Sequence, residues 1–145
     1  MMEAAQILKD GKTGVLAVCG ERQPYAVPLN FVCFDSKIYF HCALQGQKLD
    51  EIAKNRKVSF CVVAEDEIVP ERFTTRYRSV IAFGNAHVLP KGDEFFAAIR
   101  AIAAKYSPNV SEDLRENEIA KYADKMNVVA IDISHMTGKK CLELC

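Results

Sequence analysis

Residues 39–50 read Tyr39-Phe40-His41-Cys42-Ala43-Leu44-Gln45-Gly46-Gln47-Lys48-Leu49-Asp50. This stretch predicts a strand that ends in a polar residue, a turn that contains Gly46, and a helix whose first turn carries Lys48. Turn amides and a helix N-terminus can bind a phosphate, and an ammonium group can close over the anion. The spacing alone also fits a lysine that points into water.

The residues before this stretch predict strands joined by hairpins. A short helix is expected over residues 2–9, followed by strands over 14–19, 25–34 and 38–42 with tight turns between them. Pro28 cannot donate a ladder hydrogen bond, so it is expected to interrupt its strand at an edge or a bulge. Short connections of this kind indicate an antiparallel sheet.

After the stretch, a helix over residues 46–55 precedes a buried strand over 58–63 and a polar excursion around 65–71. The longest strand is expected over residues 73–89, where Gly84 suggests a bulge or a close backbone approach.

Two helices and a final strand complete the chain. Asp93 is expected to cap a helix through residue 104, and Ser111 one to about residue 125. The last strand is expected over residues 127–133. The side chains expected to face inward from the second of these helices are Leu114, Ile119, Tyr122 and Ala123.

These elements predict one domain over residues 1–145, mainly β with flanking helices, built as a closed or partly closed antiparallel barrel. Strands and helices do not alternate, which argues against a doubly wound α/β fold. Neither a Rossmann glycine motif nor a P-loop motif is present.

The composition excludes several classes of partner. Lysine plus arginine and aspartate plus glutamate each total 19, so no basic field recruits nucleic acid or an anionic membrane. The six cysteines form no CxxC pair, which argues against a zinc site and favours a reducing cytosol. No apolar run approaches the ~20 residues that span a bilayer.

A family resemblance rests on three segments: residues 25–31, residues 38–50 and residues 76–84. The first is Tyr25-Ala26-Val27-Pro28-Leu29-Asn30-Phe31, and the third is Arg76-Tyr77-Arg78-Ser79-Val80-Ile81-Ala82-Phe83-Gly84. Their order and spacing across residues 11–89, with Thr137-Gly138-Lys139 in the last strand, resemble the FMN-binding split barrel superfamily. Within it the chain is most similar to the nitroimidazole-resistance branch, whose members are relatives of pyridoxamine 5′-phosphate oxidase.

The resemblance implies an antiparallel split β-barrel that forms a homodimer, with FMN at the subunit interface and a small-molecule substrate. It implies contacts along the isoalloxazine ring, largely through main-chain groups, from Pro28, Leu29, Asn30 and Phe31. A second flavin-contacting strand and the phosphate turn would supply His41, Cys42, Ala43, Gly46 and Lys48. A third strand would supply Tyr77, Ser79 and Val80. Many relatives carry a small hydroxyl residue at Cys42, and a thiol is a poorer donor. Arg76 and Arg78 could add charge near the phosphate or the substrate, or form a solvated strand face.

These assignments predict a cytoplasmic FMN-dependent oxidoreductase of the nitroimidazole-reductase type, which reduces a small, planar, electron-poor substrate over the flavin ring. His41 is the candidate catalytic residue, because an imidazole can contact the flavin or the substrate or donate a proton to a reduced product. A histidine at a strand end can also be structural.

Three other functions stay open. One is a non-catalytic protein that binds flavin or haem on the same barrel, with His41 as the haem ligand. Another is a dimeric barrel that has lost its cofactor. Oxidation of pyridoxamine phosphate is disfavoured, because the C-terminal basic and aromatic residues of the oxidase subfamily are not found.

Overall fold

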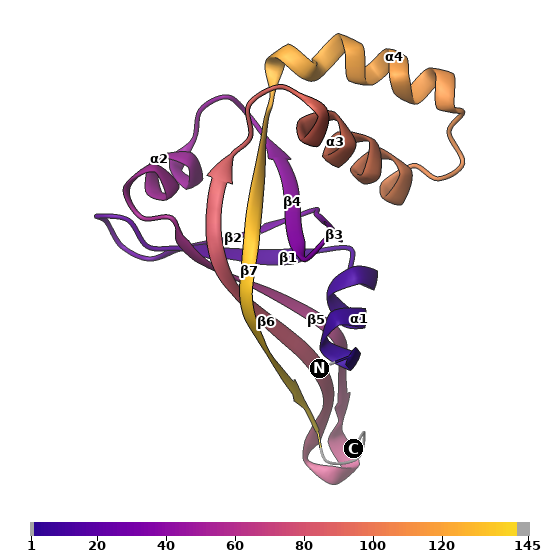
Figure 1. The fold of residues 1–145 in the computed structure, drawn as a ribbon. Coiled ribbons are helices and arrows are strands. Elements are labelled where there is room, and N and C mark those ends of the chain that lie inside the picture. Colours follow the sequence, from indigo (N-terminus) through magenta and orange to yellow (C-terminus); the bar gives the residue numbers. More distant parts are fainter. Residues whose placement is uncertain (1, 142–145) are drawn as a thin grey trace.

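Seven antiparallel strands form one sheet in a computed structural model that describes residues 2–141. The strand order is β2-β1-β5-β6-β7-β4-β3. The strands are β1 (Gly14–Val18), β2 (Tyr25–Leu29), β3 (Val32–Phe34), β4 (Lys37–Cys42), β5 (Lys57–Val69), β6 (Thr74–Val88) and β7 (Asn127–Lys140). The helices are α1 (Met2–Asp10), α2 (Gln47–Lys54), α3 (Asp93–Tyr106) and α4 (Glu112–Tyr122), with short 3-10 turns η1 (Pro70–Arg72) and η2 (Ala123–Lys125) (Figure 1).

The barrel closes through one short connection. Strands β2 and β3 lie at opposite ends of the sheet order, yet only Asn30 and Phe31 separate them in the chain. The chain therefore crosses at this point from one end of the sheet to the other. This topology confirms the antiparallel split barrel with flanking helices.

Pro28 lies inside β2, opposite Val15 of β1. Strand β2 pairs with β1 alone, so Pro28 lies in an edge strand, where proline is tolerated. The expected edge position is thus confirmed. The expected interruption at Pro28 is wrong, because the strand breaks at residues 30 and 31.

Two tight backbone positions agree with the sequence analysis. Asp35 and Ser36 both have positive φ angles, 53° and 60°, as a two-residue turn between β3 and β4 requires. At Gly84 the pairing of β6 with β7 shifts register. A Cβ atom there would overlap the carbonyl oxygen of Asp132, which confirms the close approach.

Strands β5 and β6 form a much longer hairpin than expected, and it extends away from the barrel at the bottom of Figure 1. The polar excursion expected around residues 65–71 is wrong, because β5 continues through Val69. Glu65 and Glu67 lie opposite Arg78 and Arg76, so cross-strand charge pairs replace apolar alternation in this solvent-exposed arm. Strand β7 likewise runs beyond the expected end at residue 133, to Lys140.

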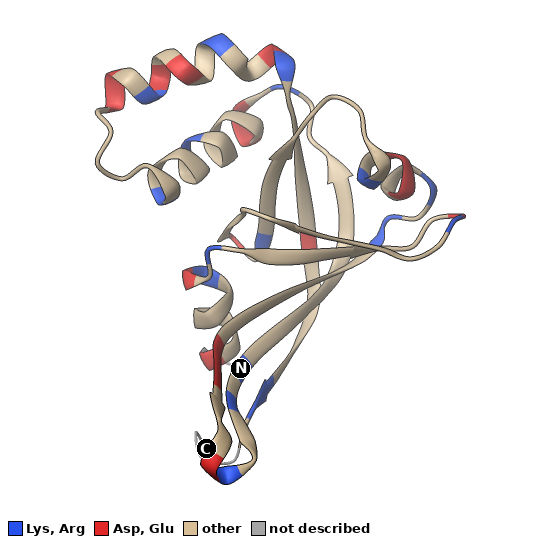
Figure 2. Ribbon diagram, turned by 180° about the vertical axis from the view of Figure 1, so that it is seen from behind, with Lys and Arg blue, Asp and Glu red and all other residues tan. Residues whose placement is uncertain are grey.

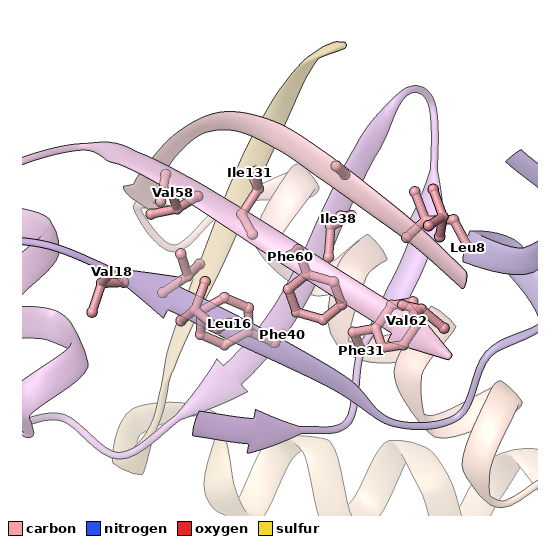
Figure 3. Packing of buried hydrophobic residues seen from close by; sticks show 14 of the residues in the cluster. Leu8, Leu16, Val18, Phe31, Ile38, Phe40, Val58, Phe60, Val62 and Ile131 are labelled. Carbon is pink, nitrogen blue, oxygen red and sulfur yellow. The ribbon is translucent and has the colours of Figure 1, made fainter. Parts of the chain in front are cut away.

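The main core fills the barrel. Leu16, Phe40, Phe60 and Val62 converge there with Phe31, and each is at most 1% exposed (Figure 3). The rings of Phe31 and Phe60 meet edge to face, with centroids 4.9 Å apart. A second cluster forms where α3 covers the outside of β4 and β7, and it includes Tyr39, Phe95, Ala98, Val128 and Ala130.

The α3–α4 pair departs from expectation in two details. Helix α3 is capped by Gly92 rather than by Asp93, which is its first residue. Ser111 caps α4 as expected and accepts a hydrogen bond from the Leu114 N–H at 3.3 Å. Leu114 and Tyr122 are 59% and 40% exposed, so their expected inward orientation is wrong. Between residues 2 and 141, no helix is long and apolar enough to span a membrane.

Candidate cofactor site

The candidate site begins where β4 leaves the sheet. Along β4, Ile38, Phe40 and Cys42 face the barrel core, whereas Tyr39 packs under α3. His41 follows Tyr39 on the same face of the strand and is exposed at its end. The turn after Cys42 is held by the side-chain amide of Asn127, which donates to the Leu44 carbonyl at 3.3 Å.

The N-terminus of α2 is open. Its cap residue Gly46 has extended backbone, with φ 161° and ψ 167°, and makes no side-chain capping hydrogen bond. Apart from Gly46 and its neighbours in the chain, no described residue has a heavy atom within 4 Å of the position that a Cβ would take at Gly46. The first amide groups of α2 have no acceptor within the helix and can therefore bind an anion.

Two cations flank this helix end. Burial raises the pKa of the Cys42 thiol, and the positive charge of nearby Lys48 opposes that rise. Lys48 is therefore near enough to Cys42 for its charge to act on the thiol. A groove of about 740 Å³ runs along α2 past Gly46 and Gln47. Arg22 from the β1–β2 turn contributes to the wall of this groove, as do the carboxylates of Asp50 and Glu51. Sequence reasoning missed Arg22, because only the fold brings that turn to α2.

His41 has a neutral imidazole near pH 7. Partial burial lowers its pKa below the ordinary value of 6.5. A neutral ring can accept a hydrogen bond, donate one, or bind a metal, whereas a full proton donor needs the imidazolium form. The lowered pKa of His41 therefore favours an orienting or ligating role over a role as a proton donor.

Residues 28–31 occupy the outer edge of β2 and the bend after it. Pro28 and Asn30 are exposed, while Phe31 is fully buried in the core. The Phe31 N–H donates to the Tyr106 hydroxyl at 2.9 Å, and its carbonyl accepts from the Lys105 ammonium at 2.9 Å. Main-chain contacts to a ligand from this segment are therefore left to Pro28, Leu29 and Asn30, whose edge strand has a free side.

Lys105 and Tyr106 fix the bend from the far end of α3. The Lys105 ammonium also donates to the Gly11 carbonyl and lies 4.0 Å from the centre of the Phe31 ring. Burial lowers its pKa. No local sequence motif could predict these contacts, because Lys105 and Tyr106 lie more than 70 residues after Phe31 in the chain.

The third predicted group, Tyr77, Ser79 and Val80, lies on β6, where the β5–β6 arm leaves the barrel. Val80 is completely buried, so only its main chain could meet a ligand. The side chains of Tyr77 and Ser79 share the opposite face of β6, and Tyr77 lies under the Lys139 ammonium at 5.4 Å. A pocket of about 290 Å³ lies between α1 and the β6–β7 pair, with Glu3, Arg78, Ser79, Lys139 and Lys140 among its lining residues.

Arg76 and Arg78 lie on the same strand, and the charge of Arg78 is partly neutralised. Arg78 forms ion pairs with Glu3 at 3.1 Å and with Glu65 at 3.7 Å. The buried Nε atoms of Arg76 and Arg78 both lack a hydrogen-bond partner among the described residues, so the ion pairs of Arg78 are what distinguish the two. Both arginines lie on the face of β6 opposite Tyr77 and Ser79.

One chain does not bring all the predicted site residues together. Cys42 lies opposite Asn127 at the start of β7, whereas Ser79 lies opposite Lys139, twelve residues further along that strand. At about 3.3 Å per residue, this separation is roughly 40 Å of strand. No group of three or more His, Cys, Asp or Glu side chains within residues 2–141 could hold a metal ion.

Several solved structures share this fold. One is a candidate 5-nitroimidazole antibiotic resistance protein from Bacteroides thetaiotaomicron, with 19% identity and a TM-score of 0.76 over 94% of this chain and 81% of that chain. A conserved hypothetical protein from Mycobacterium tuberculosis has 18% identity and a TM-score of 0.82, over 99% and 86%. The FAD and haem binding protein from Mycobacterium smegmatis has 18% identity and a TM-score of 0.75, over 97% and 70%.

At these identities the structural likeness shows the fold alone. No curated protein sequence matches the chain. The family model for pyridoxamine 5′-phosphate oxidase, however, matches residues 2–140, nearly the whole chain. The chain therefore belongs to the pyridoxamine 5′-phosphate oxidase family.

Proposed function

We propose that this protein binds FMN at a site shared by two copies of the chain and reduces a small, planar, electron-poor molecule, as a nitroimidazole reductase would. The observation that carries the proposal is the open N-terminus of α2, flanked by Lys48 and by a groove that Arg22 lines. These residues fit a phosphate monoester. Bound FMN would supply hydride or electrons, while the protein sets its orientation and surroundings.

The phosphate end explains why a lysine stands in the first turn of α2. A cation there opposes the helix dipole and costs about 0.3–1 kcal/mol. A bound phosphate converts this cost into an attraction and also accepts hydrogen bonds from the free amides. The open space above Gly46 leaves room for the anion to approach the backbone.

The ring end would lie against the free edge of β2 and the end of β4. Pro28, Leu29 and Asn30 would offer main-chain groups, and His41, Cys42 and Ala43 would line the neighbouring surface. The raised pKa of Cys42 keeps its thiol protonated near pH 7, so it can act only as a weak donor. Neutral His41 would orient the ring or the substrate by a hydrogen bond.

A second copy of the chain would bring Tyr77 and Ser79 to the same cofactor. The roughly 40 Å of strand between the two groups prevents one copy from assembling both. The sheet offers an uncharged outer face for such a partner, on parts of β1, β5, β6 and β7 that carry no charged residue in Figure 2.

Two rows of cross-strand neighbours build this face. Within them, Val15 and Ile81 are exposed although apolar, and His135 stacks on Phe83 with centroids 4.6 Å apart. Exposed apolar area of this kind marks interaction surfaces. The rows are Val15, Cys61, Ile81 and Thr137, and Ala17, Ser59, Phe83 and His135.

Flavin titration of the purified protein tests the proposal. We expect FMN to bind at micromolar concentration, with quenching of its fluorescence, and the protein to elute as a dimer in light-scattering chromatography. Riboflavin, which lacks the phosphate, should bind more weakly. Absence of FMN binding, or equal affinity for the two flavins, would remove the proposed phosphate site.

A second candidate is a non-catalytic flavin- or haem-binding protein on the same barrel. The FAD and haem binding protein from Mycobacterium smegmatis shares the fold, and neutral, exposed His41 has the protonation state of a metal ligand. A Soret band on haem addition that is lost in His41→Ala would favour this function. A flavin-loaded protein with no Soret band would favour the reductase.

A further inference from the structure

Helix α2 is fastened to the turn between β1 and β2 by a buried carboxylate. Glu51 is 3% exposed and is the one buried charged side chain of residues 3–141. Its Oε2 accepts the Gly20 N–H at 2.7 Å. A buried carboxylate is costly unless it is hydrogen-bonded, so this contact is a specific feature of the fold rather than general packing.

The same turn and the same helix meet at three more points. Gly20 leaves no room for a side chain, because a Cβ there would overlap Oε2 and lie 3.1 Å from the Cα of Glu51. The Lys54 ammonium donates to Glu21 at 2.7 Å. Beyond the helix, the Asn55 side chain donates to the Cys19 carbonyl at 2.8 Å.

These contacts involve residues 51–55, in the C-terminal half of α2 and just beyond it. They fix the helix against the β1–β2 turn, and that turn carries Arg22 to the wall of the groove beside Gly46 and Gln47. Glu51 itself lines the same groove, one helical turn beyond Gln47. Loss of the Gly20 contact would release both the helix amides and Arg22.

We propose that Glu51 is a positioning residue for an anion site formed by the α2 N-terminus and Arg22. In this site Arg22 is a second cation, in addition to Lys48. The inference rests on the proposed phosphate site and identifies what holds that site in shape. Because Glu51 acts through Gly20 and the helix, its amide analogue should serve nearly as well as the carboxylate.

The test is the ratio of riboflavin Kd to FMN Kd, which isolates the phosphate contribution. In Glu51→Ala we expect the ratio to fall at least fivefold, with riboflavin affinity nearly unchanged. In Glu51→Gln, whose amide oxygen can still accept from Gly20, the ratio should stay within twofold of wild type. In Arg22→Ala the ratio should fall at least threefold, because this exposed side chain contributes charge without contributing to the fold.

Amide hydrogen exchange on the flavin-free protein provides a readout that does not depend on flavin. Residues 47–54 should exchange faster in Glu51→Ala than in wild type or in Glu51→Gln. The double variant Glu21→Ala/Asn55→Ala removes two exposed contacts between turn and helix, together with the hydrogen bond that the Asn55 side chain accepts from the Lys57 N–H. It tests the attachment of α2 to the turn if Glu51→Ala fails to fold. In the double variant we expect a ratio lowered at least twofold and faster exchange.

An unchanged ratio and unchanged exchange in the folded variants would overturn the inference. A wild-type protein with no preference for FMN over riboflavin would instead refute the phosphate site itself, so the two failures are distinguishable.

Discussion

Replacement of Lys48 by alanine should weaken FMN binding at least tenfold, which corresponds to about 1.4 kcal/mol. Two unit charges about 4 Å apart attract by about 1 kcal/mol in bulk water and about 4 kcal/mol at the effective dielectric of a protein surface. Lys48 is half-buried, so its attraction to each negative charge of a phosphate lies between these limits. The flavin-free variant should be as stable as wild type or slightly more stable, because the unfavourable cation is removed from the helix N-terminus.

The assay is fluorescence titration with FMN and with riboflavin at one ionic strength. Lys48→Ala should lose affinity for FMN and keep its affinity for riboflavin. Lys121→Ala provides a matched control, since this exposed lysine lies on α4, away from the site. Equal FMN affinity in Lys48→Ala and wild type would show that the phosphate is bound elsewhere, and a parallel loss of riboflavin affinity would point to the ring instead.

Three further predictions concern stability, the thiol and pH. Gly84→Ala should lower the free energy of unfolding by about 1–3 kcal/mol or more in denaturant titration, because its Cβ would overlap the Asp132 carbonyl. Gly138→Ala is the control and should be nearly neutral, because the nearest atom to its Cβ would be 3.7 Å away. Equal stabilities of the two variants would argue against the bulge at Gly84. Cys42→Ser should tighten FMN binding by about 0.5–1.5 kcal/mol if a hydroxyl donates where the thiol does so poorly, and weaker binding in the serine variant would count against that contact. Burial lowers the pKa of His41, so below pH 6.5 the unfolded chain binds its proton more readily than the folded protein does. When the pH is lowered from 7.5 to 5.5, the melting temperature should therefore fall more in wild type than in His41→Gln. Equal falls would mean that burial does not lower the pKa of His41.

The sequence predicted those elements whose patterns are local. The order of polar strand end, Gly46 and a helix carrying Lys48 corresponds to β4 and α2, and the helix begins one residue after Gly46. Gly84 marked a real bulge. In both cases the feature depends on neighbouring residues: Gly46 lies in the turn just before the helix, and a close backbone approach needs a glycine at residue 84.

What could not be predicted depends on contacts between distant segments. The bend at residues 30 and 31 is fixed by Lys105 and Tyr106, which no local pattern connects to it. The arm around residues 65–71 is polar because both of its faces meet water, so periodicity could not reveal a strand. Leu114 has the spacing of a core residue on its helix, yet Ile119 is the buried residue of α4, and Leu114 stays 59% exposed.

The proposed shared site was also out of reach of local sequence patterns. Sequence resemblance groups Tyr77, Ser79 and Val80 with Lys48, but the structure of one chain separates them along the sheet. Only a second copy, packed on the uncharged face of β1, β5, β6 and β7, would reunite them. The sequence did not predict Arg22 and Glu51 as site residues, because their proposed roles depend on the β1–β2 turn, which only the fold brings to α2.

Complementation between two defective variants tests the central claim most directly. Lys48→Ala disables one end of the proposed site, and Tyr77→Ala/Ser79→Ala disables the other. The two proteins are unfolded together, refolded as a mixture, and titrated with FMN. If each site takes residues from two copies, random mixing should restore about one quarter of the wild-type number of high-affinity sites, since half of the dimers are mixed and each mixed dimer has one intact site. A mixture that binds no better than the separate variants, or a Tyr77→Ala/Ser79→Ala protein that binds FMN like wild type, would contradict the account.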